Sequence, residues 1–168
     1  GPNTVEASSW ATHPDYTSAA FFLHDVGVIT LAAPVALDED DYGVLPAVDS
    51  LDSLRPGRRS SFTAVGYGLQ RVNPAQVQAE RVRMQAEPYL VQINVPGMVG
   101  DFSLLLSNNA STGGTCFGDS GGPNYVGSTN VIGGVTSFGL NGTCGGTGGV
   151  FRVDRENVLD FIDGVVAN

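Results

Sequence analysis

The chain has 168 residues, a formal net charge of −9 and a hydrophobic fraction of 42%. This length suits one domain, and the apolar runs are too short to cross a bilayer as a helix, so we expect no membrane partner. The acidic balance argues against a nucleic-acid partner, because that binding rests on cationic neutralisation of phosphates, and the 23 glycines with only 15% charged residues are typical of a turn-rich β protein.

The first half of the chain predicts one apolar strand and a long connection. Residues 21–34 predict one apolar strand, with Pro34 after it. Residues 36–59 are acidic and rich in turn signals, which predicts a path over the surface. The run Asp38-Glu39-Asp40-Asp41 fits a solvated face, with a cation site as the alternative because hard cations take carboxylate oxygens.

From residue 61 onward, short strand signals recur between Gly, Asn and Pro clusters, which is the pattern of a sandwich or barrel. The predicted strands are Ser61–Tyr67, Glu80–Gln85, Tyr89–Val95, Phe102–Ser107, Asn124–Val126, Val131–Phe138 and Gly149–Val153. Beyond them the apolar spacing becomes helical through Val158, Leu159, Phe161, Ile162, Val165 and Val166. Asp154 is the predicted N-cap of this helix, whose apolar stripe we expect to face the core.

The most informative segment is Gly114–Pro123, which reads Gly-Thr-Cys-Phe-Gly-Asp-Ser-Gly-Gly-Pro. A serine is a poor nucleophile until a base activates it, and flanking glycines let the backbone bend tightly against a substrate carbonyl. The N–H groups of Gly118 and Ser120 can then converge on an oxyanion, each worth about 3–4 kcal/mol of barrier. The alternative is a Gly-rich turn with an incidental serine.

The pattern Gly118-x-Ser120-x-Gly122 also fits the nucleophile elbow of α/β-hydrolases. That fold places its histidine after the serine in the chain, and no histidine follows Ser120. We therefore reject this interpretation.

Gly118–Pro123 resembles the nucleophile segment of the chymotrypsin/trypsin family of serine proteases over six consecutive residues. Four further segments resemble the same family. The aspartate strand is matched by His24–Leu31, the His-Pro-x-Tyr turn by His13–Tyr16, the Gly-Trp-Gly strand end by Gly66–Gly68, and the Ser-Trp-Gly edge by Val135–Gly139.

The resemblance implies an all-β fold, a chymotrypsin-like double β-barrel whose first barrel is incomplete in this chain, with a C-terminal helix. Residues 1–35 would be the end of the first β-barrel, 36–60 the inter-barrel connection, 61–153 the second β-barrel and 154–168 the helix. An open half-barrel exposes strand edges and apolar faces. Either another chain supplies the absent strands or the fragment has repacked.

The resemblance assigns the catalytic roles. Ser120 matches the nucleophile, the amides of Gly118 and Ser120 the oxyanion hole, and Asp25 the carboxylate that orients a histidine. Neither His13 nor His24 matches that histidine, which lies further upstream in the family. We therefore expect the chain to be a processed or excised C-terminal piece, inactive alone, whose partners are the N-terminal part of the same protease domain and a peptide or protein substrate.

The resemblance also assigns a specificity pocket. Gly114 matches its floor, Phe117 its entrance, and Gly149 a wall. The edge Ser137, Phe138 and Gly139 would pair with an extended substrate. No acidic residue occurs between Asn124 and Val153, so we expect a neutral pocket that takes large apolar side chains, although each glycine has a simple turn as its alternative.

The two cysteines, Cys116 and Cys144, match family half-cystines, so we expect a disulfide, with two separate thiols as the alternative. A disulfide favours a secreted, extracellular protein. No Cys-x-x-Cys spacing exists, so we expect no metal, and the reaction of the family needs no cofactor. Asp119 matches a residue that pairs with a newly cleaved N-terminal amine, and we expect it to be unpaired here.

The function that follows is serine endopeptidase activity, in which peptide bonds are hydrolysed through an acyl-enzyme. A non-catalytic pseudoprotease or binding module of the same fold is the alternative.

Overall fold

The computed structural model describes residues 4–73, 76–94 and 100–167. Its centre is an antiparallel sheet in the order β6-β3-β7-β8-β11-β10-β9, which a further β3–β9 pairing closes into a six-stranded barrel, with β6 continuing along β3. The strands are β3 (Gly57–Gly66), β6 (Met84–Ala86), β7 (Tyr89–Ile93), β8 (Ser103–Asn108), β9 (Pro123–Val126), β10 (Ile132–Gly139) and β11 (Gly146–Arg152). The predicted strand end at Val95 and the domain limits at residues 1–3 and 168 lie outside the described residues.

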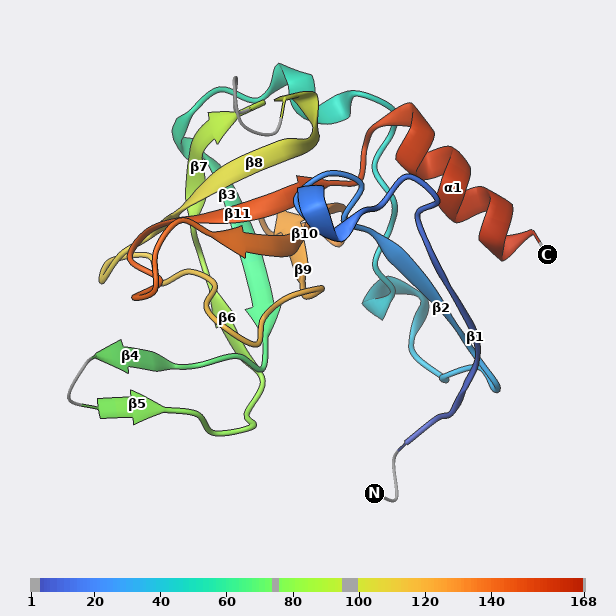
Figure 1. The fold of residues 1–168 in the computed structure, drawn as a ribbon, viewed down its shortest axis with the longest axis horizontal. Coiled ribbons are helices and arrows are strands. Elements are labelled where there is room, and N and C mark those ends of the chain that lie inside the picture. Colours follow the sequence, from blue (N-terminus) through green and yellow to red (C-terminus); the bar gives the residue numbers. More distant parts are fainter. Residues whose placement is uncertain (1–3, 74–75, 95–99, 168) are drawn as a thin grey trace.

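Beside this barrel lies a small antiparallel sheet of β1 (Ala7–Thr12) and β2 (Gly27–Leu31), with helix α1 (Glu156–Val166) next to it (Figure 1). The hairpin of β4 (Arg71–Asn73) and β5 (Gln76–Gln78) projects from the opposite side of the barrel. Short 3-10 turns η1 (Ser18–Ala20), η2 (Glu39–Asp41), η3 (Ser50–Ser53) and η4 (Gly100–Phe102) complete the described elements. The expected fold class, all-β with one complete barrel and a C-terminal helix, is confirmed.

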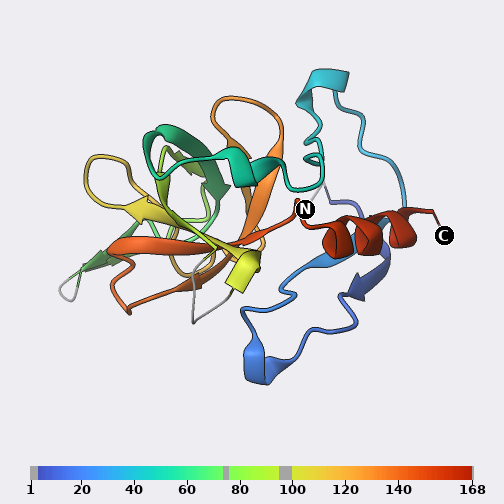
Figure 2. The ribbon, with the colours of Figure 1, turned by 90° about the horizontal axis from the view of Figure 1, so that it is seen from above.

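Two apolar clusters hold these parts together. The barrel interior is filled by Leu51, Phe62, Leu90, Leu104, Leu106 and Val150. A second cluster of Phe151, Val153 and Val158 takes in Val26 beside β2 and Ile162 of α1, so the helix bridges the barrel and the small sheet (Figure 2). The apolar stripe of α1 thus faces the core, as expected.

The small sheet carries large apolar side chains that are exposed. Trp10 and Ile29 are cross-strand partners and are 77% and 66% exposed. Burying such side chains would be worth about 1.5–3 kcal/mol each. The expectation that a half-barrel leaves apolar faces uncovered therefore holds for this sheet.

Three expectations are corrected. Residues 21–34 hold only the short β2, because Phe22 and Leu23 belong to a loop that packs on Leu105 and Phe138 of the barrel. The strand predicted over Ser61–Tyr67 runs over Gly57–Gly66 instead. Asp154 is not the N-cap of α1, a position that Arg155 takes, because the Asp154 carboxylate is buried and bound elsewhere.

That carboxylate belongs to a network centred on the fully buried Arg152. The guanidinium donates to both oxygens of Asp154 at 2.9 and 2.8 Å and to Asp52 at 2.8 Å, and Asp154 also accepts the N–H of Leu51 at 2.9 Å. The hydrogen bond from Arg152 holds the pKa of Asp52 below its ordinary value. The network ties the connection at η3 to the end of β11.

We predict that Arg152→Met lowers the free energy of unfolding by about 3–5 kcal/mol, because it leaves the buried Asp154 carboxylate without a counter-charge. The matched control is Arg155→Met, whose partners Asp49 and Asp52 are about half exposed, and it should cost less than about 1 kcal/mol. Urea unfolding at pH 7 measures both. Equal losses in the two variants would contradict the assignment.

The sign of the pH dependence follows from Asp52. Its lowered pKa contributes stability that is present above the unfolded pKa and is lost as the pH falls through the folded pKa.

Candidate active site

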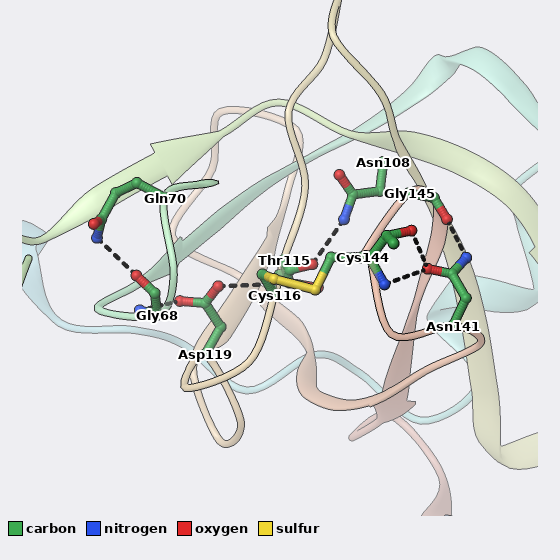
Figure 3. The surroundings of a disulfide bond; sticks show 10 residues. Gly68, Gln70, Asn108, Thr115, Cys116, Asp119, Asn141, Cys144 and Gly145 are labelled. Carbon is green, nitrogen blue, oxygen red and sulfur yellow. Dashed lines mark hydrogen bonds between the residues drawn. A yellow bond between two sulfur atoms is a disulfide. The ribbon is translucent and has the colours of Figure 1, made fainter. Parts of the chain in front are cut away.

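The loop that carries Ser120 runs from β8 to β9 and is held by the carboxylate of Asp119. One oxygen of Asp119 accepts the N–H of Gly68 at 2.7 Å and the other accepts that of Cys116 at 2.8 Å (Figure 3). The sequence predicts that Asp119 lacks the N-terminal amine that would pair with it in the family. Within the described residues no cationic group forms an ion pair with it, and two backbone amides bind its oxygens.

Glycine is required around this carboxylate. A Cβ on Gly66 would lie 1.9 Å from Asp119 Oδ1, and one on Gly68 would lie 2.6 Å from Asp119 Cγ. Real Cβ atoms do not approach so closely, so any side chain at either position would push the carboxylate out. The Gly66-Tyr67-Gly68 run is therefore a cradle for Asp119.

The turn that follows leaves two donors unused. The N–H groups of Asp119, Gly121 and Gly122 donate to backbone carbonyls at 3.1, 2.9 and 2.8 Å. Within the described residues, those of Gly118 and Ser120 donate to none. Gly118 has φ +96°, a conformation that glycine adopts readily. The two amides expected to form an oxyanion hole are thus available.

Ser120 is exposed and lines two cavities. One, of about 360 Å³, lies between the barrel and the small sheet and is lined by Asp25 as well as by Thr12, Tyr16, Val135 and Thr136. Asp25 precedes β2, and its Oδ2 accepts a hydrogen bond from Ser137 Oγ of β10 at 2.5 Å. The structure thus brings Asp25 and Ser120 to one cavity.

The second cavity, of about 230 Å³, contains no charged lining residue. Phe21, Phe117 and Phe138 line it with the Cys116–Cys144 disulfide, Ser137 and Gly139. Four of the six residues expected at the specificity pocket, Phe117, Ser137, Phe138 and Gly139, therefore lie beside Ser120.

The other two expected pocket residues, Gly114 and Gly149, do not line this cavity. A Cβ on Gly149 would lie 2.4 Å from the Phe138 ring, so that ring covers it. Gly114 lines a neighbouring cavity with Asp119, and the space for its side chain is filled by Asn108, 2.3 Å from the Cβ position. Asn108 Nδ2 donates to the carbonyl of Thr115 at 2.7 Å (Figure 3).

The expected disulfide is confirmed. Cys116 and Cys144 are bonded with their Cα atoms 5.3 Å apart, which joins the nucleophile loop to the turn between β10 and β11 (Figure 3). Asn141 fixes that turn, because its side chain donates to Gly145 O at 2.7 Å and accepts from Thr143 N at 3.0 Å.

Neither histidine reaches the cavities at Ser120. His13 is buried and stacks on His24 with ring centroids 4.7 Å apart. Burial, and secondly the neighbouring His24, lower the pKa of His13. The base of a triad is thus absent among the described residues at this site.

Sequence reasoning missed Phe21, Asn108 and the buried Asn124, which donates to Thr136 Oγ1 at 3.0 Å. The sequence predicts a strand at Phe21, and nothing in the local sequence marks Asn108 or Asn124, since their partners lie in the next loop or strand.

In the described part of the chain, no helix is long and apolar enough to cross a membrane.

Comparison with known proteins identifies relatives. The family model described as Trypsin matches residues 1–162. Brachyurin of Leptuca pugilator is 30% identical over 145 residues, which are 84% of this chain and 59% of the relative, so the chain spans about three fifths of the length of this curated relative.

Solved structures show the same fold at lower identity. Human heparin binding protein has a TM-score of 0.75 at 22% identity, over 98% of this chain and 67% of that one. HL collagenase has a TM-score of 0.76 at 20% identity, over 98% and 70% of the two chains. An inactivated protease paralogue of the scabies mite has a TM-score of 0.69 at 16% identity, over 96% and 68%. Because the family model covers all but six residues of the 168, the chain belongs to the trypsin family.

Proposed function

We propose that this chain carries the nucleophile side of a serine endopeptidase, and that a histidine from a preceding segment completes it. The observation that carries the proposal is the position of Ser120 between two cavities, one shared with Asp25 and one apolar. The first suits a base and its orienting carboxylate, and the second suits a substrate side chain. The matched part is 59% of the relative Brachyurin, so that relative holds further residues beyond the matched part.

The reaction assigns a role to each group. The histidine takes the proton of Ser120 Oγ as the oxygen attacks the scissile carbonyl. The new oxyanion accepts hydrogen bonds from the free N–H groups of Gly118 and Ser120. Asp25 has one oxygen on Ser137, which leaves the other to accept an imidazole N–H and fix its tautomer. The protonated histidine gives its proton to the departing amine as the C–N bond breaks, and water, deprotonated by the same histidine, then hydrolyses the acyl ester on Ser120.

Substrate and location follow from the same features. A peptide would lie along Ser137–Gly139 with its side chain in the apolar cavity. The Cys116–Cys144 disulfide supports an oxidising, extracellular location. The cradle around Asp119 supports its family role, since a cleaved N-terminal amine would enter the adjoining cavity of about 220 Å³.

We predict that the 168-residue chain alone hydrolyses an N-acyl-phenylalanine nitrophenyl ester about 10⁴–10⁶ times more slowly than a complete protease, because no base activates Ser120. Free imidazole should enter the cavity at Asp25 and raise the rate saturably. Ester hydrolysis followed at rising imidazole concentration measures this effect.

Two variants make this experiment decisive. Ser120→Ala should abolish the saturable component, and Asp25→Asn should weaken it by at least about tenfold, while the linear reaction of imidazole in solution is unchanged. An imidazole response identical in Ser120→Ala and the parent chain would instead favour the non-catalytic alternative.

We also predict a preference for large apolar residues before the scissile bond. A buried guanidinium without a counter-charge loses several kcal/mol of hydration, whereas an aromatic ring gains from a dry cavity. In imidazole-supplemented reactions, Phe and Leu esters should react at least about tenfold faster than Arg or Lys esters. Faster turnover of the Arg ester would show that the pocket is assigned wrongly.

A further inference from the structure

His13, Asp15 and His24 come together at the end of the small sheet, and none of them lines either cavity at Ser120. His13 follows β1 and His24 precedes β2, and the backbone joins them where His13 N donates to Val26 O at 3.0 Å. One donor atom from each of the three side chains lies within 4.8 Å of the other two. We propose that these three residues form a binding site for one zinc(II) ion.

The first support is a buried nitrogen without a partner. Within the described residues, Nδ1 of His24 is buried and makes no hydrogen bond. Leaving a buried polar atom unsatisfied costs about 1–3 kcal/mol. His24 also has φ +53°, an unusual backbone for a residue with a side chain, which directs its ring against His13. A metal ion would satisfy the unpaired nitrogen.

The second support is the state of His13. Its Nδ1 accepts the N–H of Asp15 at 3.2 Å, so this nitrogen carries a lone pair. This hydrogen bond is long, so a zinc ion can replace the Asp15 N–H as the partner of His13 Nδ1. The ring also makes a hydrogen bond with the backbone of Asn157 in α1. Histidines that bind metals are commonly oriented in this way by a backbone carbonyl on their second nitrogen.

The donor set selects the ion. Two imidazoles and one carboxylate suit zinc, which takes three protein ligands and a water in open tetrahedral sites, whereas Ca²⁺ and Mg²⁺ prefer oxygen alone. Asp15 is exposed and gives the ion and its water a path from solvent. Residues 1–54 hold nine Asp and Glu and no Lys or Arg, so the local field attracts cations.

Coordination requires a small movement. Tetrahedral zinc–nitrogen bonds of about 2.0–2.1 Å place neighbouring ligand atoms about 3.3 Å apart. The ligand atoms of His13, Asp15 and His24 lie within 4.8 Å of one another, so the two most distant atoms must approach by up to about 1.5 Å. The rings stack with an angle of 21°, and a nitrogen binds metal in the plane of its ring. The half-buried His24 must therefore tilt out of the stack. Because Asp25 follows directly, an occupied site would fix the backbone that carries it.

The experiment is calorimetric titration of the untagged 168-residue chain with ZnCl₂ at pH 7.5. The chain has only these two histidines, and both cysteines are in the disulfide, so imidazole or thiol sites elsewhere cannot contribute. We expect saturable binding of one ion. Calcium chloride in the same titration should give no saturable heat, and calcium binding as tight as zinc binding would overturn the proposal.

Three variants assign the site. His24→Asn should abolish binding, and its side chain tolerates the left-handed backbone. Asp15→Asn should weaken binding by at least about tenfold, while Asp40→Asn, an exposed carboxylate elsewhere, should bind as the parent does. Far-UV circular dichroism confirms that each variant is folded. Absence of saturable zinc binding in the parent, or unchanged affinity in both His24→Asn and Asp15→Asn, overturns the proposal.

Discussion

A partly buried carboxylate needs hydrogen-bond donors, and at Asp119 this requirement determines the path of the loop between β8 and β9. Its two oxygens take backbone N–H groups from two separate segments, the turn after β3 and the loop before β9. The donors can reach it only because Gly66 and Gly68 lack side chains. Ser120 is the next residue, so the direction of its hydroxyl and of the two unused amides depends on this one interaction.

The other side of the site depends on α1. Val26, one residue after Asp25, packs in the cluster of Phe151, Val153 and Val158, which the helix shares with the barrel. His13 contacts Phe161 of the helix, with ring centroids 5.1 Å apart. The buried Arg152–Asp154 pair precedes the helix directly and anchors its start. The packing of Val26 against this cluster thus helps to position Asp25 relative to the barrel.

The sequence alone predicts those parts of the fold that are marked by a short motif or by the spacing of neighbouring apolar residues. A motif marks Gly118–Pro123, local apolar patterns predict most barrel strands, and the pairing of Cys116 with Cys144 follows from the family resemblance. The strand predicted over Glu80–Gln85 is wrong for most of its length, since β6 covers only Met84–Ala86. Features that rest on distant partners are not predicted in this way. Strand β1 is rich in Ala and Ser and is a strand only through pairing with β2. The apolar residues Phe22 and Leu23 have the pattern of a strand but lie in a loop that packs on the barrel. The local sequence predicts Asp154 as a helix N-cap, but its carboxylate binds Arg152 instead.

The contact between Asn108 and Gly114 couples two positions that lie on either side of one loop. A Cβ introduced at 114 would lie 2.6 Å from Asn108 Cβ as well as 2.3 Å from its Cγ, so trimming the asparagine to alanine still leaves a clash. Gly114 also has φ +159°, which residues with a side chain rarely adopt. A substitution at 108 that keeps a Cβ therefore does not open position 114, and replacement of this glycine requires the backbone itself to move.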